Sequence, residues 1–295
     1  MSVIVAASPT AAPKRTRSLP RIFRSKAVLF GSIVLGVLIL IAIFASVLGV
    51  VDPAAVQPRL RLKPPSAAAW LGTDHLGRDV YSRLVYGSRV SLLVGGVVAL
   101  LAVVFGALLG LISGAVRWVD GLLMRAMDGV MAIPAILFAV AMIGALGADL
   151  VTICIAIAIP EIPRVARLVR SVVLTVREEP YIEAAVSMGT RTPTLIARHM
   201  LPNVLAPLIA QATYIASSAI LIEASLSFLG IGMPDEVPSW GNMMANARLV
   251  FQVKPLLMLL PGLCIVLTVF AINRIGDGLR DLLDPRLAKS VGRLK

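Results

Sequence analysis

The sequence predicts an all-α, polytopic membrane protein with six transmembrane helices. Of its 295 residues, 58% are hydrophobic and only 15% are charged, and the mean hydropathy is +0.90, whereas soluble domains are about 45–50% apolar and about 25% charged. Several apolar runs approach the length of about 20 residues that a helix needs to cross the hydrocarbon core. Aromatic residues are few and no segment alternates between apolar and polar residues, so helices are favoured over a β-barrel.

Each predicted helix is an apolar run bounded by polar or turn-forming residues. The first run is longer than the apolar region of a signal peptide, so we interpret it as a retained span that follows a polar tail, residues 1–26. Pro134 is expected to kink the third span near its inner end. The six predicted spans are residues 27–51, 90–116, 129–147, 150–170, 204–229 and 256–275.

The positive charges predict the orientation of these spans. Lysine and arginine are enriched in cytoplasmic loops, and most of the 28 such residues fall in the two tails and in the second-to-third and fourth-to-fifth connections. Both termini, including the tail 276–295, are therefore expected in the cytoplasm. This distribution explains the net charge of +12 better than binding to nucleic acid does.

The first outer loop, residues 52–89, is an exception, because it contains six positive residues. We expect its part 72–89 to form a short amphipathic helix with the arginines on its water-facing side. The remaining chain, residues 90–275, is expected to form a five-helix core.

Glycines recur every four residues in the second predicted span, at Gly106, Gly110 and Gly114. In lipid, helices associate through close backbone packing, which such a ridge of small residues permits. The ridge could pack against another span of this chain or against a second membrane subunit.

Glu223 and Ser225 are polar residues inside the fifth predicted span. A charge at bilayer depth costs about 2.5–3.5 kcal/mol on insertion scales, so such a residue normally faces a cavity or a partner. Both residues are candidates for lining a transport pathway. The alternative for Glu223 is a structural hydrogen bond between helices or a protonated carboxyl group.

Glu161 lies between Pro160 and Pro163 near the inner end of the fourth predicted span. Prolines remove helix donors, so we expect a kink or an unwound section here. A structural role is favoured for Glu161, because Arg164 and Arg167 are close enough in sequence to pair with it.

No catalytic or cofactor-binding motif is found. The two histidines, His75 and His199, fall on opposite sides of the membrane in the predicted topology, and no metal-ligand spacing occurs. No lysine follows a glycine, so the chain lacks a phosphate-binding loop of the Gly-Lys-Ser/Thr type. If ATP powers transport, a different polypeptide hydrolyses it.

The fourth-to-fifth connection, residues 177–203, is expected to form a cytoplasmic elbow of two short helices. Acidic residues and Pro180 suit the start of a helix at about 180–188, and Gly189 suits its end. Thr192-Pro193 suits the start of a second helix, 193–200, which Pro202 is expected to end. Ala184 and Ala185 are expected to keep one surface small, so that a partner's groove can approach.

The elbow resembles the coupling-loop signature of ABC importer permeases. The matching residues are Glu183-Ala184-Ala185, Gly189 and Leu201-Pro202, and His199 departs from the pattern because isoleucine is usual there. Four further segments are similar to the C-type subunit of the peptide/nickel permeases: Gly72 to Arg83, Leu226 to Gly232, Ser239-Trp240-Gly241 and Gly276 to Pro285. The resemblance covers residues from about 25 to about 290.

The resemblance implies a type I ABC importer permease fold in the inner membrane of a bacterium. It implies one half of a translocation pathway for peptides, with nickel or another small solute as the alternative cargo. The implied partners are a homologous B-type permease, two ATPase subunits that bind ATP and magnesium, and an extracytoplasmic substrate-binding protein. The residues that would couple to the ATPase are Glu183, Ala184, Ala185, Gly189, Leu201 and Pro202.

Two other classes of function remain open from the residues alone. An ion-coupled secondary transporter would use Glu223 as its coupling carboxylate and would need no ATPase. A membrane scaffold would assemble with partners without transporting a solute.

Overall fold

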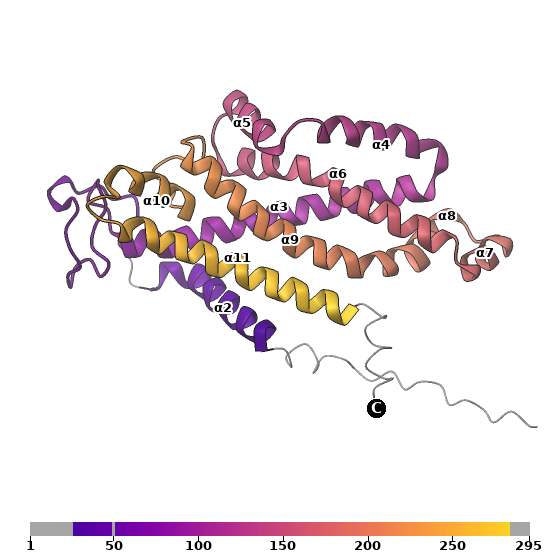
Figure 1. Ribbon diagram of the computed structural model, residues 1–295, viewed down its shortest axis with the longest axis horizontal. Helices are drawn as coiled ribbons and strands as arrows, with labels where there is room; N and C mark the ends of the chain where they lie inside the picture. Colours follow the sequence, from indigo (N-terminus) through magenta and orange to yellow (C-terminus); the bar gives the residue numbers. More distant parts are fainter. Residues whose placement is uncertain (1–25, 49–50, 284–295) are drawn as a thin grey trace, which may run out of the picture.

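The computed structural model describes residues 26–48 and 51–283, which form an elongated bundle of helices (Figure 1). The outer loop and α10 lie at one end of the bundle, and α7 and α8 lie at the other (Figure 1). Most of the predicted tails, 1–26 and 276–295, lies outside the described residues. The principal helices are α2 (Lys26–Ile43), α3 (Val80–Ala115), α4 (Arg117–Met131), α5 (Ala135–Leu146), α6 (Leu150–Arg177), α7 (Pro180–Ser187), α8 (Thr192–Leu195), α9 (Leu201–Phe228), α10 (Trp240–Ala247) and α11 (Leu256–Leu283).

The all-α fold is confirmed, but the count of six spans is not. Four helical segments are long and apolar enough to cross a membrane: Lys26–Ser46, Val80–Ala115, Thr192–Phe228 and Leu256–Asp281. The bent pair α4 and α5 makes a fifth if it is counted as one span. The 28-residue α6 packs along α3, but Glu161, Arg164 and Arg167 make it more charged than the helices in this count.

Three predicted boundaries move. The first helix ends at Ile43, before the predicted residue 51, and a 3₁₀ turn, Phe44–Ser46, follows it. Helix α3 begins ten residues before the predicted start, because Asp79 caps it by accepting a hydrogen bond from the backbone N–H of Ser82 at 2.7 Å. At the other end of the chain, α11 continues to Leu283, so the predicted tail 276–295 begins as helix.

The third predicted span, 129–147, is two helices instead of one. The chain breaks at Pro134, as expected, but α4 already occupies residues 117–131 and meets α5 at an angle of 81°. The sequence pattern missed α4 because one of its faces is polar. On that face Asp120 accepts hydrogen bonds from Nε and Nη2 of Arg170 at 2.5 and 2.6 Å, and Asp128 pairs with Arg167 of α6.

The glycine ridge of α3 packs against α6 of the same chain. A Cβ atom added at Gly110 would lie 2.5 Å from the carbonyl oxygen of Ala166, and one added at Gly106 or Gly114 would lie 2.5 or 2.6 Å from side-chain carbons of Val165 or Val173. The glycine face is therefore occupied by α6 of the same chain, which supports the intramolecular alternative. The missing side chains let two long helices approach until backbone and valine methyl groups touch.

The predicted unwound section around Glu161 does not occur. Helix α6 stays α-helical through Pro160 and Pro163, both of which are buried. Each proline removes one backbone donor, but Val165 and Val169 on the same helix are fully buried. The packing of α6 along α3 maintains the helix where local propensity alone predicts a break.

Two of the three arginines in the segment 72–89, Arg78 and Arg83, are buried, so the prediction that its arginines face water is wrong for these two. Only 2% of Arg78 and 1% of Arg83 are exposed. Arg78 Nε donates to Asp74 at 2.7 Å, and Arg83 Nη1 donates to the carbonyl oxygens of Pro53 and Asp235 at 3.1 and 3.3 Å. These bonds join the outer loop to the connection between α9 and α10, which no local sequence pattern reveals.

Replacing Gly110 with alanine tests the contact between α3 and α6. The added methyl group overpacks the seam and should cost about 1–3 kcal/mol, which would lower the midpoint of thermal unfolding in detergent. Gly96→Ala is the matched control, because Gly96 lies on the same helix with nothing within 4 Å of an added Cβ. The control should be neutral or stabilising by up to about 1 kcal/mol; equal midpoints for both variants would contradict the proposed packing.

Candidate functional site

The elbow begins with the short helix α7, at the end of the bundle opposite the outer loop (Figure 1). Glu179 is its N-cap residue, with Pro180 in the first turn, as the sequence predicts. Gly189 follows with a φ of +81°, the left-handed conformation that glycine adopts most readily. Gly189 therefore allows the chain to reverse between α7 and α8.

The second half of the elbow differs from the prediction. Instead of a separate helix at 193–200 ended by Pro202, the chain is helical from Thr192 through a π turn, Ile196–Met200, into α9. The backbone N–H of Leu201 donates to the carbonyl of Ile196, five residues earlier. Such a turn accommodates a missing donor, and Pro202 therefore lies in the first turn of α9. Leu201 and Pro202 connect the elbow to a long helix through continuous helical backbone.

The residues of the Glu-Ala-Ala motif lie on two sides of α7. Ile182 and Ala185 are 3% and 5% exposed and pack into the core, whereas Glu183 and Ala184 are exposed. The expectation that Ala184 and Ala185 form one small outer surface is therefore wrong, because positions i and i+1 on a helix do not face the same way. Ala185 anchors α7 to the bundle, and Glu183 and Ala184 remain accessible to another molecule.

Tyr181, His199 and Asn203 join α7 to the π turn. The rings of Tyr181 and His199 lie with centroids 6.0 Å apart. Asn203 Nδ2 donates to the carbonyl oxygen of His199 at 2.6 Å and to the Tyr181 hydroxyl at 3.4 Å. The residue that departs from the family pattern, His199, therefore takes part in the contact between α7 and the start of α9.

An open hollow of about 550 Å³ lies against the elbow. Its lining includes Glu183 and Ser187 of α7, Ala115 at the end of α3, and Arg177 at the end of α6. Arg177 Nη1 donates to the carbonyl oxygen of Gly114 at 2.8 Å, which places a cation at the helix C-terminus where it is stabilising. The C-terminal ends of α3 and α6 are thus joined by a hydrogen bond, next to the hollow that α7 also lines.

The two histidines lie at opposite ends of the bundle, as the topology predicts. His75 belongs to the outer loop and His199 to the elbow. Burial lowers the pKa of His75 below its ordinary value. Within residues 26–48 and 51–283, no group of three or more His, Cys, Asp or Glu residues could hold a metal ion.

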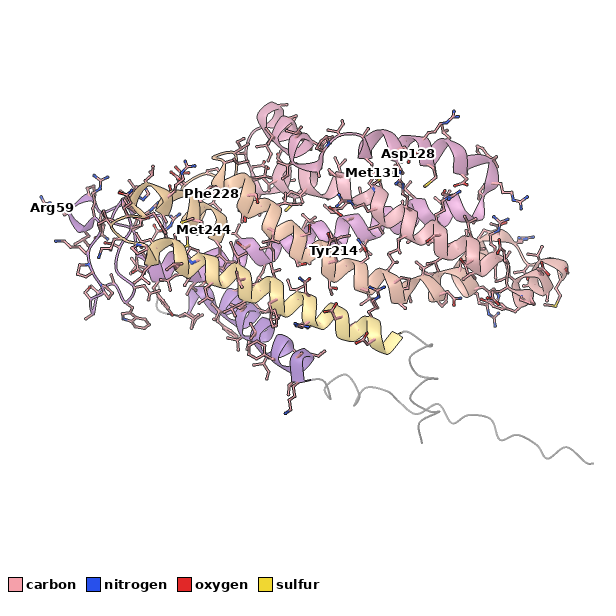
Figure 2. All side chains as sticks on the ribbon, in the orientation of Figure 1. Arg59, Asp128, Met131, Tyr214, Phe228 and Met244 are labelled. Carbon is pink, nitrogen blue, oxygen red and sulfur yellow. The ribbon has the colours of Figure 1, made fainter. Side chains whose placement is uncertain are left out.

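Glu161 is buried against a cation of its own helix. It is 1% exposed, and its Oε1 accepts a hydrogen bond from Arg164 Nη1 at 2.5 Å. Arg167, the other expected partner, pairs instead with Asp128 of α4. Asp128 is labelled in Figure 2.

Glu223 is buried between α9 and α10, with only 1% of the residue exposed. Its Oε1 accepts hydrogen bonds from the hydroxyls of Ser227 and Ser239 at 2.9 and 2.7 Å. Ser239 also caps α10, because its hydroxyl accepts from the backbone N–H of Asn242. Ser225 points elsewhere and is exposed. The arrangement supports the structural alternative for Glu223, and a pathway role for either residue stays a prediction.

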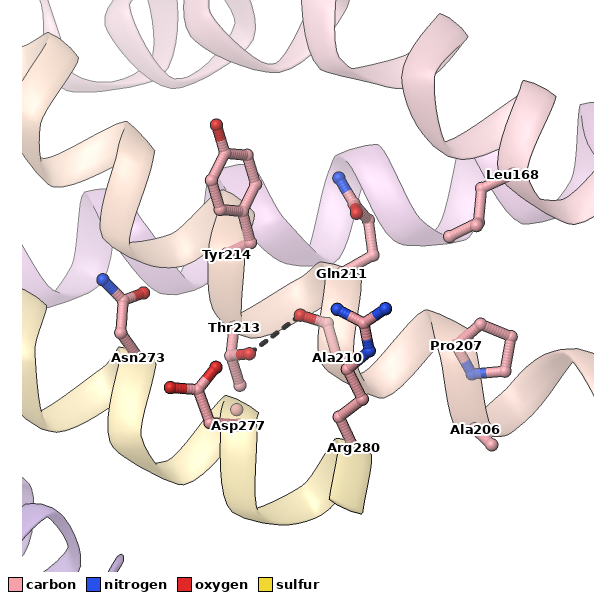
Figure 3. A pocket seen from close by; sticks show the side chains of 11 residues that line it. Leu168, Ala206, Pro207, Ala210, Gln211, Thr213, Tyr214, Asn273, Asp277 and Arg280 are labelled. Atoms are coloured by element: carbon pink, nitrogen blue, oxygen red, sulfur yellow. Dashed lines mark hydrogen bonds between the residues drawn. The ribbon is translucent and has the colours of Figure 1, made fainter. Parts of the chain in front are cut away.

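A groove of about 720 Å³, lined in part by polar side chains, runs between α6, α9 and α11 (Figure 3). Gln211 and Tyr214 of α9 and Asn273, Asp277 and Arg280 of α11 line it. No motif in the sequence marks these residues as lining a groove. Their signal was nevertheless present, because each is a polar residue inside or beside an apolar run.

The long, tightly packed helices and the exposed elbow define a permease subunit of the ABC importer class. The chain belongs to the family described as the binding-protein-dependent transport system inner membrane component, whose model matches residues 91–289. Residues 17–65 match a second model, described as the N-terminal transmembrane domain of oligopeptide transport permease C.

Several curated relatives are similar over most of their length. A probable peptide ABC transporter permease protein, y4tQ of Sinorhizobium fredii, is 52% identical over 80% of this chain and 81% of its own. The dipeptide transport system permease protein DppC of Alkalihalophilus pseudofirmus is 44% identical over 90% and 87%. A probable D,D-dipeptide transport system permease protein, DdpC of Escherichia coli, is 41% identical over 86% of each chain.

A solved structure supports the fold. A chain of the MetNI methionine ABC transporter, in inward-facing conformations, matches with a TM-score of 0.57 over 68% of this chain and 96% of its own. The sequence identity is 19%, so this likeness concerns the fold alone.

Variants of Glu223 separate its two possible roles. Glu223→Gln keeps an oxygen acceptor for both serines and should leave stability and transport near wild type. Glu223→Leu leaves two buried hydroxyls without this acceptor, which should cost about 1–3 kcal/mol and lower the thermal midpoint in detergent. Transport by the reconstituted complex is measured alongside. A stable Glu223→Gln protein that no longer transports would instead support an ion-coupled or pathway role.

Proposed function

We propose that this chain is the membrane-spanning half of an ATP-driven importer for peptides. The observation that supports this most directly is the elbow, where Glu183 and Ala184 face outward on α7 while Ile182 and Ala185 fix that helix to the bundle. The relatives named for peptide and dipeptide transport support peptides as the substrate class.

The proposed complex contains a homologous B-type permease, two ATPase subunits and an extracytoplasmic substrate-binding protein. The ATPase subunits would bind ATP and magnesium, because the sequence has no Gly-Lys-Ser/Thr loop. The family description itself names dependence on a binding protein. The exposed apolar side chains of Trp118 and Leu122 on α4, 84% and 71% accessible, are suited to lipid or to a second permease.

We place the protein in the inner membrane of a bacterium with both termini in the cytoplasm. In Figure 1 the first turn of α2 and the last turn of α11 point toward the end that carries the elbow. Their proximity is also shown by Gly278, where an added Cβ would lie 2.4 Å from Val28. Together with the positive charges of the elbow, this arrangement favours one cytoplasmic end and an outer end formed by the loop and α10.

The proposed mechanism is alternating access driven through the elbow. When ATP closes the ATPase dimer, α7 moves with the ATPase groove that holds it. The buried anchors Ile182 and Ala185, and the contact between Tyr181 and His199, would pass this displacement to α6 and α9. Because α9 is helical without interruption from the elbow onward, a shift at one end must move the far end or bend the helix.

The exposed acid on α7 provides the sharpest test of coupling. Glu183→Arg should reduce co-purification of the ATPase subunits and peptide uptake about tenfold or more, because it reverses a charge on the free face without touching the core. Glu236→Arg makes the same change at an exposed site at the opposite end and should retain the ATPase subunits. Normal retention and uptake with Glu183→Arg would contradict the coupling role.

The substrate class is tested with the complete complex in proteoliposomes. Uptake of a radiolabelled dipeptide should require ATP, magnesium and the binding protein, and should persist without an ion gradient. Uptake of nickel but no peptide would select the alternative cargo. Uptake that depends on an ion gradient and not on ATP would select a secondary transporter.

A further inference from the structure

The groove between α9 and α11 is lined by several polar and charged side chains, which are unfavourable in contact with lipid. Tyr214 is 55% exposed, and Gln211, Asn273, Asp277 and Arg280 all line the same space. Polar and charged side chains at bilayer depth normally face water or a partner because their exposure to hydrocarbon is costly. Tyr214 lies about midway along the bundle (Figure 2), so the groove belongs neither to the elbow nor to the outer loop.

The floor of the groove is a close crossing of two helices. A Cβ added at Gly276 would lie 2.1 Å from Oγ1 of Thr213, so α9 and α11 touch where only glycine fits. Thr213 donates its hydroxyl to the carbonyl oxygen of Ala210 (Figure 3). This contact fixes the spacing of the two helices from which the polar side chains project.

Most of the polar side chains above this floor have no partner within the described residues and are available to a ligand. In Figure 3, Gln211 and Tyr214 project from α9 to the same side, and Arg280 projects toward α9 from α11. Within the described part of the chain, Asp277 and Arg280 form no ion pair, and the Gln211 amide makes no hydrogen bond. Asn273 Oδ1 accepts only from the hydroxyl of Ser217, at 2.8 Å.

We propose that this groove, through Gln211, Asn273, Asp277 and Arg280, binds a short peptide with free termini during translocation. The proposal rests on the proposed function as a peptide importer. Carboxamides offer one donor group and one acceptor, as the peptide bond does, so Gln211 and Asn273 can pair with a peptide backbone regardless of its side chains.

The two charges fit the ends of a short peptide. Asp277 and Arg280 are three residues apart on a helix, which places their Cβ atoms about 5–6 Å apart. An extended dipeptide spans about 7 Å, so its ammonium group can face Asp277 while its carboxylate faces Arg280. The groove volume of about 720 Å³ is within the range of about 300–1,000 Å³ that is usual for small-ligand sites.

Two substitutions test the groove in the complete reconstituted complex, with a radiolabelled alanyl-alanine probe. Gln211→Leu removes a side chain that makes no internal hydrogen bond, so the fold should be retained. Import at saturating binding protein should fall about fivefold, the factor that one lost hydrogen bond of about 1 kcal/mol produces. Asp277→Asn should reduce import about tenfold, while the subunits of the complex still co-purify.

Asp281→Asn is the matched control, because Asp281 is exposed on the same helix but does not line the groove. It should import like wild type. A dipeptide with a photoreactive side chain, trapped with vanadate during turnover, should label α9 or α11 in the wild-type and control complexes and label Gln211→Leu several-fold less.

Three results would overturn the proposal. Wild-type import by both Gln211→Leu and Asp277→Asn would remove the groove from the pathway while leaving peptide import intact. A photoreactive residue at position 214 that labels the partner permease in place of the peptide would show that protein fills the groove. If the wild-type complex imports no dipeptide, the proposed function fails, and this inference fails with it.

Discussion

The contact between α3 and α6 is the interaction on which the rest of the structure depends. Gly106, Gly110 and Gly114 let the backbone of α3 approach Val165, Val169 and Val173 until no further atom fits. In a bilayer, lipid satisfies an apolar helix surface almost as well as another helix does, so close packing and not apolarity specifies the partner. This contact positions α6. Two arginines of α6, Arg167 and Arg170, pair with aspartates of α4, and the C-terminal end of α6 leads directly into the elbow.

The elbow combines a firm attachment with an accessible face. Its inner residues, Ile182 and Ala185, are buried in the same core as the valines of α6. Its outer residues, Glu183 and Ala184, contribute little to that core and remain available to a partner. The π turn connects the elbow to α9, because it lets Pro202 lie in the first turn of α9 without interrupting the helix. Helix α7 is consequently in contact with two long helices, α6 and α9.

Buried polar groups stabilise the opposite end of the bundle. Glu223 binds two serines from α9 and the start of α10, and Arg83 reaches carbonyl oxygens from both the outer loop and residue 235. Such groups are costly to bury unless they are hydrogen-bonded, so their partners define one arrangement of the loops. Between this end and the elbow, the groove on α9 and α11 contains Gln211, Asp277 and Arg280, which form no side-chain hydrogen bond or ion pair within the described residues.

The sequence by itself determined the class of the protein, the start of α7, the turn at Gly189 and the break at Pro134. These features arise from composition or from residues a few positions apart, which is the range over which propensity and capping act. It also indicated that the glycines form a packing surface, but the identity of the partner helix required the structure.

The tertiary structure decided the features that depend on distant residues. Arg83 is buried because acceptors from residues 53 and 235 surround it. Helix α6 passes through two prolines because packing against α3 outweighs the lost hydrogen bonds, and α4 is a helix whose polar side is paired with α6. The groove likewise needs α9 and α11 side by side. Contacts between segments far apart in sequence have no local pattern, so only the folded chain reveals them.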